Sequence, residues 1–277
     1  MTDNAIASLD QSVDEEDGEP IWPYEQGDLM PGGHRAWERL GVGRRCEAWL
    51  VWSPLLWAPA VLKLARPHQA DHPRAVRTLR REVNALHGNP HPVLPRLYAD
   101  GTLDTVPWIA LEYVDGPTLA DELEDAGPLA ADDVALLGVQ LLTGLRAVHR
   151  RRVAHLDVKP DNIVLRDGRP VLIDFGSARG IGTRQPAGHP VGTLGYAAPE
   201  MEACEPVAAS MDIYALAVTL REAWAGPDRG DARLGTVIDR LGAPDPRRRP
   251  SADAALGELS SVLPEDAHPW PPWVACG

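Results

Sequence analysis

Short apolar runs separated by polar turns dominate the first 115 residues, and this pattern predicts strands rather than long helices. The runs that fit strands are 40–51, read as two strands about a glycine turn, 60–64, 97–99 and 108–113. Between the third and fourth strands, apolar residues recur every three or four positions over 73–88, which predicts one helix. The N-terminal part is therefore predicted to hold five strands and one helix.

Beyond residue 115 the apolar spacing becomes that of helices. Thr118-x-x-Asp121 fits a capping box at the start of the first of them. Further helices are predicted over 134–148, 211–224, 232–241 and 252–262, with short strand-like runs at 163–165 and 171–173. The pattern indicates an α+β protein in which a strand-rich part precedes a mainly helical one.

Acidic residues are concentrated at the N-terminus. The first 30 residues contain nine Asp or Glu and no Lys or Arg, so this segment carries most of the net charge of −13. A segment so acidic and poor in apolar residues buries too little surface to offset its chain entropy. Residues 1–33 are therefore expected to be a disordered leader, and nothing in the remaining charge pattern indicates nucleic-acid binding.

The sequence offers no candidate membrane span. Its longest apolar run, 48–62, is broken by Ser53, Pro54 and Pro59 and is shorter than the roughly 20 residues that a spanning helix needs. The N-terminus lacks the basic start and apolar stretch of a signal peptide. The three cysteines form no C-x-x-C pair that would indicate a disulfide framework or a zinc site. These features predict a cytoplasmic protein.

Lysine is rare in this chain. Of 27 basic residues two are lysine, Lys63 and Lys159, and all others are arginine. A bias that replaces lysine by arginine wherever charge alone matters would leave lysine at positions where a guanidinium cannot serve. Lys63 and Lys159 are therefore candidates for functional residues.

Three motifs follow one another in the second half of the chain. Residues 155–162 read H-L-D-V-K-P-D-N, D-F-G follows at 174–176, and A-P-E follows at 198–200. This order resembles the eukaryotic-type (Hanks-type) Ser/Thr protein kinases of bacteria over about residues 34–263. The resemblance implies a bilobal protein-kinase fold, with an N-lobe at 34–114 and a C-lobe at 115–263. It also implies transfer of the γ-phosphoryl group of ATP, held by Mg²⁺, to Ser/Thr hydroxyls of protein substrates.

The resemblance assigns a role to each polar residue of the first two motifs. Asp157 is expected to accept or orient the substrate hydroxyl, and Lys159 to reach the γ-phosphate. Asn162 and Asp174 supply the hard oxygen ligands that magnesium prefers.

The N-lobe is expected to hold the rest of the phosphate site. Lys63 would contact the α- and β-phosphates, and Glu82 on the predicted helix would fix Lys63 by an ion pair. Gly41 and Gly43 match the first two glycines of G-x-G-x-x-G, whereas Cys46 stands at the third. Cys46 is interpreted as a small filler residue, with a redox-active thiol as the alternative.

The adenine pocket is expected where residues 108–114 meet Asp115-Gly116. The resemblance places backbone contacts to adenine at Glu112 and Val114. The expected apolar lining consists of Leu40, Ala48, Val61, Leu111 and Val164.

The remaining assignments concern the peptide segment and the framework of the C-lobe. By resemblance, Thr193 belongs to the segment that accepts the substrate and bonds to Asp157 and Lys159. The expected structural residues are His155 packed with Phe175, Glu200 paired with Arg249, and Asp212 anchoring the backbone of the loop at 155–162.

Two departures from the family pattern carry predictions. Leu156 stands where regulated kinases have the arginine that grips a phosphorylated activation segment, so phosphorylation is expected to be a weaker switch here. Asp212 and Arg249 are 37 positions apart, which leaves room for one helix after the central one. The exposed docking helix is therefore expected to be absent or reduced, with specificity supplied by a regulatory or docking partner or by the flanking segments.

Two alternatives remain at the level of sequence. One is a small-molecule kinase of the same fold, against which Lys159, Thr193 and Glu200 argue. The other is a pseudokinase scaffold, favoured by the irregular glycine turn alone. Residues 264–277 form a Pro/Trp-containing tail that is expected to pack either on the kinase unit or on a partner.

Overall fold

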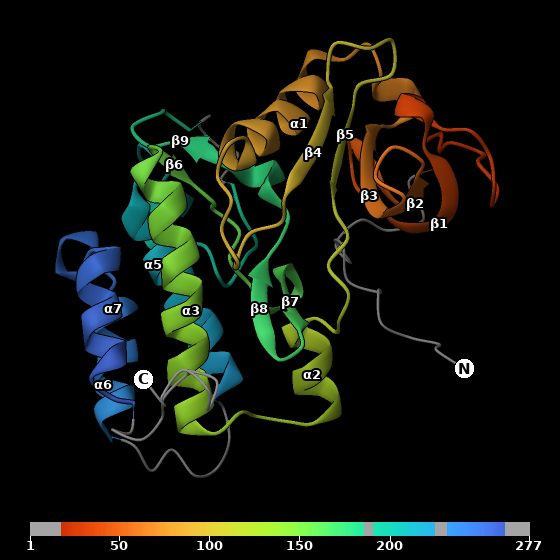
Figure 1. Ribbon diagram of the computed structural model, residues 1–277. Coiled ribbons are helices and arrows are strands. Elements are labelled where there is room, and N and C mark those ends of the chain that lie inside the picture. Colours follow the sequence, from red (N-terminus) through yellow and green to blue (C-terminus); the bar gives the residue numbers. More distant parts are fainter. Residues whose placement is uncertain (1–17, 186–190, 225–231, 264–277) are drawn as a thin grey trace.

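The N-terminal part folds into one antiparallel sheet of five strands in the order β1-β2-β3-β5-β4 (Figure 1). The computed structural model describes residues 18–185, 191–224 and 232–263. The strands are β1 (Arg35–Val42), β2 (Cys46–Ser53), β3 (Ala58–Ala65), β4 (Leu97–Gly101) and β5 (Trp108–Glu112). One helix, α1 (Pro73–Leu86), lies between β3 and β4. The predicted five strands and one helix are confirmed.

Alternation along the strands gives the sheet two different buried faces. On β3, Leu62 and Leu64 are fully buried in an outer apolar cluster. Val61 and Lys63 alternate with them and therefore line a cleft on the opposite face. Because successive side chains on a strand point to opposite faces, Lys63 points toward the cleft.

Helix α1 carries both core and functional positions on one face. Pro73 at the first turn has the fixed φ that a helix start needs, and the His72 ring accepts a hydrogen bond from the backbone N–H of Arg74. Leu79 and Glu82, three residues apart, lie on the same side of the helix, and both are buried. Glu82 is thereby directed toward the sheet and the cleft.

The segment before β1 differs from the sequence expectation. Residues 1–33 were predicted to be disordered, but the described part from Gly18 packs on the sheet, and Met30 is 3% exposed. Trp22 stacks on Tyr24 at 5.7 Å and donates through Nε1 to the carbonyl of Ala65 at 2.8 Å. A few apolar side chains hold this segment although its average composition is acidic. Residues 1–17 lie outside the described residues.

The C-terminal part is mainly helical, as predicted (Figure 1). Its helices are α2 (Leu119–Asp125), α3 (Ala131–Arg150), α4 (Pro199–Glu202), α5 (Ala209–Ala223), α6 (Ala232–Leu241) and α7 (Ala252–Ser260). Its strands are β6 (Val153–Ala154), β7 (Ile163–Arg166), β8 (Arg169–Leu172) and β9 (Arg179–Gly180), paired as β6 with β9 and β7 with β8. The predicted capping box at Thr118 and Asp121 is present at the start of α2.

Helix α3 is the centre of the helical core. Its apolar face packs against α5 and α7, and Leu141 and Leu145 on it are fully buried. Gly138 allows this close approach, because a Cβ there would lie 2.7 Å from Leu259 and 2.9 Å from Leu220. The core fixes the loop after α3, which carries the first chemical motif.

The region after α5 is short, as the residue spacing predicted. Between α5 and Arg249 the described residues contain α6 and the 3-10 turn Pro246–Arg248. The turn predicted at 226–231 lies outside the described residues, as does the tail at 264–277. The part of the chain that the structure describes therefore shows one full helix here.

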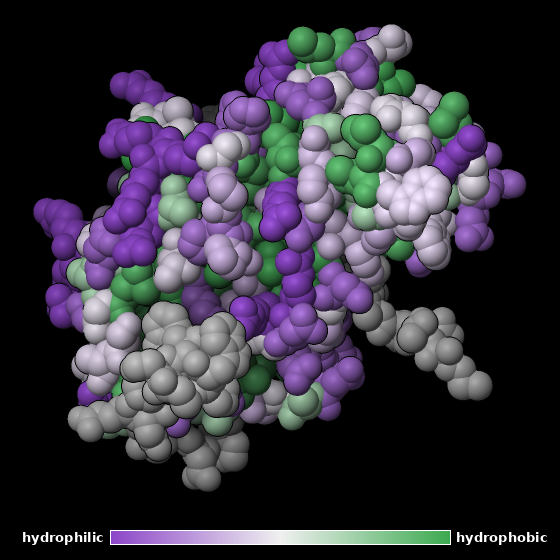
Figure 2. All heavy atoms as spheres, in the orientation of Figure 1, coloured by the Kyte–Doolittle hydropathy of each residue, from purple (hydrophilic) through white to green (hydrophobic). Residues whose placement is uncertain are grey.

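The face seen in Figure 2 is polar over much of the helical part, whereas apolar side chains reach the surface over the sheet. At the β2–β3 turn, Leu55 is 91% and Trp57 77% exposed. Within the described ranges, no helix combines the length and apolar character needed to cross a membrane.

Candidate active site

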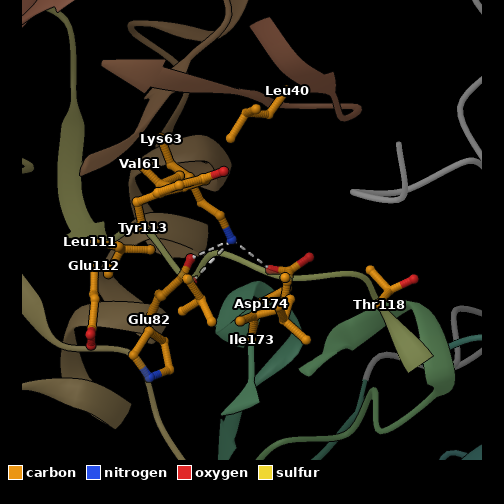
Figure 3. A pocket seen from close by; sticks show the side chains of 14 residues that line it. Leu40, Val61, Lys63, Glu82, Leu111, Glu112, Tyr113, Thr118, Ile173 and Asp174 are labelled. Carbon is orange, nitrogen blue, oxygen red and sulfur yellow. Dashed lines mark hydrogen bonds and ion pairs between the residues drawn. The ribbon is translucent and has the colours of Figure 1, made fainter. Parts of the chain in front are cut away.

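A cleft lies between the sheet and the helical part (Figure 3). It is lined by Leu40, Val61, Lys63, Glu82, Pro95, Leu111, Glu112, Tyr113, Val114, Gly116, Thr118, Val164, Ile173 and Asp174. These residues come from the sheet, from α1 and the loop before β4, from the connection between β5 and α2, from β7 and from the segment after β8.

Lys63 joins three separate elements in this cleft. Its Nζ donates to both carboxylate oxygens of Glu82, at 3.0 and 3.1 Å, and to Oδ1 of Asp174 at 2.9 Å. Figure 3 shows the ammonium between the two carboxylates. The expected Lys63–Glu82 pair is thus confirmed, and Asp174 is a second anionic partner of the same lysine.

The ion pairs decide the charge states of this cluster. Burial alone would lower the pKa of Lys63, but the carboxylates of Asp174 and Glu82 raise it. Burial would likewise raise the pKa of Asp174, whereas the ammonium of Lys63 and the N–H of Gly176 lower it to about 2. At neutral pH Lys63 is therefore charged and Asp174 ionised.

The turn at 174–176 ties α1 to the helical part. Asp174 has a left-handed backbone, with φ 59°, and its Oδ1 accepts from the N–H of Gly176 at 3.1 Å. Phe175 is fully buried, and its backbone N–H donates to Glu82 at 3.3 Å. The ring of Phe175 packs edge-on against His155 at 4.5 Å, as expected.

His155 is held as a neutral framework residue. Its Nε2 lies 3.1 Å from the carbonyl of Ile173, and its Nδ1 accepts from the backbone N–H of Asp157 at 3.2 Å. Nε2 therefore donates while Nδ1 accepts, which fixes the neutral tautomer. Both ring nitrogens are engaged in positioning the loop.

Asp157 faces the cleft within a small hydrogen-bond network. Its Oδ1 accepts from Thr193 at 2.8 Å, and its Oδ2 from the side-chain amide of Asn162 at 3.1 Å. Lys159 lines the same part of the cleft, and its Nζ makes no hydrogen bond within the described residues. The expected Thr193–Asp157 bond is present, and the expected Thr193–Lys159 bond is not.

Asp212 on α5 holds the backbone of the loop that carries Asp157. Its two carboxylate oxygens accept from the N–H groups of His155 at 2.8 Å and Leu156 at 2.7 Å. Burial alone would raise the pKa of Asp212, but the hydrogen bond from His149 and the backbone donors lower it. The bonds hold Leu156 at φ 68°, a left-handed conformation that costs a bulky residue about 1–2 kcal/mol.

The predicted pair of Glu200 and Arg249 is formed in the helical part. The guanidinium donates to both carboxylate oxygens, at 2.5 and 2.9 Å, and stacks on Tyr214 at 4.8 Å. Arg249 also donates to the carbonyls of Ser210 and Pro244. This buried network joins the A-P-E segment to α5 and to the turn before α7.

The expected adenine residues line the cleft, with one difference. Ala48 packs with Leu40 and Leu50 and lines the adjoining part of the cleft, toward the glycine turn. The N–H of Val114 has no backbone or side-chain acceptor within the described residues, so it is available to a ligand. The lining residues that the sequence prediction did not place in the pocket are Pro95, Thr118 and Ile173.

The glycine turn is closed by its own backbone. Gly43 donates from its N–H to the carbonyl of Cys46 at 2.8 Å. Burial raises the pKa of Cys46 to about 12, so its thiol stays protonated at neutral pH. The structure therefore favours the interpretation of Cys46 as a small filler residue and disfavours the alternative, a reactive thiolate.

The donor set fits one magnesium ion shared with phosphate oxygens. Asn162 and Asp174 line one cavity, and within the described residues neither Oδ1 of Asn162 nor Oδ2 of Asp174 accepts a hydrogen bond. The described ranges contain no group of three or more His, Cys, Asp or Glu that could hold a metal by themselves. Two protein oxygens, completed by phosphate and water, match the way magnesium is usually bound.

A family model described as the protein kinase domain matches residues 37–229. The chain belongs to the protein kinase domain family. It is 34% identical over 234 residues to the probable serine/threonine-protein kinase PkwA of Thermomonospora curvata, covering 82% of this chain and 31% of that protein. It is 31% identical over 239 residues to the serine/threonine-protein kinase PknB of Mycolicibacterium smegmatis, covering 82% of this chain and 38% of that protein.

Solved structures agree with this assignment. The kinase domain of PknI from Mycobacterium tuberculosis superposes with a TM-score of 0.67 at 27% identity, covering 87% of this chain and all of that one. The bilobal kinase fold and the resemblance to bacterial Ser/Thr kinases are confirmed. The chain spans about a third of the length of the two curated relatives named above.

The ion pairs of Lys63 make stability depend on pH in a definite direction. The folded pKa of Asp174, about 2, lies below its unfolded value of about 3.9. Its contribution to stability is therefore present above about pH 4 and is lost as pH falls toward 2. Lys63→Met leaves Glu82 and Asp174 without their cation, so we expect a loss of about 3 kcal/mol at pH 7 that shrinks at pH 5, where both acids protonate more readily.

Urea denaturation followed by tryptophan fluorescence at the two pH values measures this change. Lys159→Met is the matched control, because Lys159 forms no ion pair within the described residues. A deficit of Lys63→Met that is equal at pH 7 and pH 5 contradicts the assignment.

Proposed function

We propose that this chain is an ATP- and Mg²⁺-dependent protein kinase that transfers the γ-phosphoryl group to Ser or Thr hydroxyls of protein substrates. One observation carries the proposal. Lys63 pairs with Glu82 and Asp174 in a cleft that Asp157 and Asn162 also line. Asp157 is in turn hydrogen-bonded to Asn162 and Thr193. Phosphoryl transfer depends more on positioned charges than on covalent chemistry by the protein, and this cleft supplies such charges.

ATP fits the cleft in one orientation. The apolar walls from Leu40, Val61 and Val164 suit the two faces of adenine, and the free N–H of Val114 suits its hydrogen-bonding edge. The triphosphate then extends toward Lys63 and Lys159. Both lysines are compact point charges of the kind that suits phosphate oxygens.

The polar residues of the cleft have different roles in phosphoryl transfer. Asn162 and Asp174 would hold Mg²⁺, which when bound neutralises charge that develops on the phosphate oxygens. Asp157, fixed by Thr193 and by its loop, orients the acceptor hydroxyl and receives its proton through a carboxylate oxygen. Lys159 offers three donors that no described residue uses.

Transfer to protein hydroxyls is favoured over the two alternatives. The bond of Thr193 to Asp157 links the peptide-accepting segment directly to the catalytic carboxylate, as peptide phosphorylation needs. A pseudokinase is disfavoured because Glu82, Lys63 and Asp174 stand in contact. A docking partner remains a prediction from the short region after α5, and a cytoplasmic location remains a prediction from the sequence.

Label transfer from ATP tests the proposed function. The full chain is incubated with γ-labelled ATP and Mg²⁺, with model proteins as acceptors in one set and hydroxylated small molecules in the other. We expect label on protein, and a loss of about 100-fold or more, roughly 2.7 kcal/mol, in the isosteric variant Asp174→Asn. Asp133→Asn, an exposed change on α3, is the control that keeps full activity. Label on small molecules alone, or equal transfer by Asp174→Asn, contradicts the proposal.

Leu156 generates a separate expectation about the activation segment. Its side chain is 1% exposed and packs with Ala198 and Met201, so it offers no cation to a phosphate. The exposed Thr183 hydroxyl donates to the carbonyl of Gly180. We expect Thr183→Ala to retain activity within about threefold, whereas Thr193→Ala loses about tenfold or more, which is about 1.4 kcal/mol.

Initial rates of label transfer by the two threonine variants measure this difference. A tenfold loss in Thr183→Ala would mean that another basic group reads a phosphate at that position.

A further inference from the structure

The segment before β1 is attached to the sheet by hydrogen bonds as well as by apolar packing. Residues 18–30, here called the N-terminal strap, run beside β1, β2 and β3 (Figure 1). The backbone N–H of Trp22 donates to Glu47 on β2 at 2.8 Å. The carbonyl of Trp22 accepts from Arg39 on β1 at 2.6 Å, and its Nε1 donates to the carbonyl of Ala65 on β3 at 2.8 Å. One strap residue is therefore fixed to three strands.

Glu47 gives the sheet a reason to keep the strap in place. Its side chain is fully buried, forms an ion pair with Arg39 at 3.3 Å and accepts from Nε1 of Trp49 at 3.1 Å. A buried carboxylate needs charged partners or hydrogen-bond donors to offset its lost hydration. The N–H of Trp22 is one of these donors, so release of the strap would leave Glu47 with fewer partners.

Arg66 connects the strap to the glycine turn. It follows β3 directly, is 3% exposed, and donates through Nη2 to the carbonyl of Glu19 at 2.8 Å and through Nε to that of Pro20 at 3.3 Å. Its Nη1 donates to the carbonyl of Gly43 at 3.3 Å, and its backbone N–H donates to that of Arg45 at 2.9 Å. Within the described residues the guanidinium has no carboxylate partner, so carbonyls of the strap and the turn satisfy it.

The bond from Arg66 orients one peptide unit of the glycine turn. In a trans peptide the C=O group and the following N–H point in opposite directions. Because the carbonyl of Gly43 points toward Arg66, the N–H of Arg44 points away from it. In the part of the chain that the structure describes, this N–H has no acceptor. Gly43 and Arg44 line the cleft with Lys63, whereas Arg66 does not, so the N–H is available to a ligand there.

A turn built on glycine needs support from outside to keep one conformation. Gly41 and Gly43 have no side chains that could pack, and residues 43–45 belong to no strand. One hydrogen bond, from Gly43 to the carbonyl of Cys46, closes the turn on itself. A turn that left its binding position for part of the time would lower the affinity for its ligand by the same fraction.

We propose that the N-terminal strap, acting through Arg66, holds the glycine turn where its backbone meets the phosphates of the nucleotide. The proposal rests on the proposed function, because these phosphates are those of the ATP that the cleft would bind. Trp22 places the carbonyls of Glu19 and Pro20, and these carbonyls place the guanidinium. The guanidinium in turn places Gly43. Arg66 is thus a positioning residue, since it does not itself line the cleft.

The proposal differs from a purely stabilising role in which ligands it affects. No strap residue lines the part of the cleft that suits adenine, whose walls come from Val61, Leu111 and Val164. A strap that only stabilised the fold would not distinguish a nucleoside from its triphosphate. A strap that positions the glycine turn is expected to affect the triphosphate alone.

Calorimetric titration with two ligands tests the proposal without any need for catalysis. The full chain is titrated with a non-hydrolysable ATP analogue in the presence of Mg²⁺, and separately with adenosine. We expect Arg66→Gln to weaken binding of the analogue about tenfold and to change adenosine binding by less than about twofold. Arg35→Gln is the matched control, because Arg35 donates to the strap at Gly27 and makes no bond to the glycine turn. The control is expected to bind both ligands as the wild type does.

A second variant tests whether the strap acts through Arg66. Trp22→Ala removes the side chain that anchors the strap, and it is expected to cause the same selective loss of analogue binding. The variant with both changes is expected to bind the analogue no more weakly than either single variant, because both changes break one path. Losses that add in the double variant would mean that the strap and Arg66 act independently.

Amide hydrogen exchange of the wild type supplies a test that needs no variant to fold. If the strap favours phosphate binding, bound phosphates must stabilise the strap by the same factor. We expect the ATP analogue with Mg²⁺, but not adenosine, to slow exchange of the backbone N–H groups of Trp22 and Arg66.

Three results would overturn the proposal. They are equal effects of Arg66→Gln on the two ligands, additive losses in the double variant, and exchange at Trp22 and Arg66 that both ligands slow to the same extent. If the wild type binds the analogue and adenosine while the variants show no selective loss, the role of the strap alone is wrong. A wild type that binds neither ligand contradicts the proposed function, and the role of the strap with it.

Discussion

The bridge from Lys63 to Glu82 and Asp174 is the interaction on which the rest of the site depends. Each of its three residues comes from a different element, namely β3, α1 and the segment after β8. The bridge therefore sets the position of α1 against the sheet and of the helical part against both. Because the charges are buried, losing one partner costs far more than the intact cluster contributes.

A second set of contacts fixes the other side of the cleft. Asp212 on α5 binds two backbone N–H groups of the loop that carries Asp157, and the His155 ring joins that loop to the segment before Asp174. The groups that meet ATP and the acceptor hydroxyl thus rest on helices of the core. Such support keeps catalytic groups in register with little reorganisation.

The chemistry of the site could be predicted from sequence because each functional residue sits in a short motif with fixed spacing. Lys63 was marked by the rarity of lysine and by its place on a predicted strand, and Glu82 by its place on the helix that resembles the family's. The order of the motifs then supplied the fold. The Lys63–Asp174 contact was not foreseen, because 111 residues separate the partners and no local pattern reports it.

Features that depend on tertiary contacts could not be predicted from the sequence. The N-terminal segment looked disordered because average composition hides Trp22 and Tyr24, whose packing is specific to the sheet they cover. Thr118 lines the cleft through the path of the chain after β5.

The central claim is that Lys63 acts through a compact ammonium held between two carboxylates, and the swap Lys63→Arg tests it directly. The variant keeps the charge but replaces a point donor by a planar fork that cannot occupy the same geometry. The measurement is kcat/KM for label transfer, with urea denaturation to show that the variant is folded. The account predicts a fall of about 100-fold or more, roughly 2.7 kcal/mol, in a folded protein. Near-normal turnover by Lys63→Arg would contradict it.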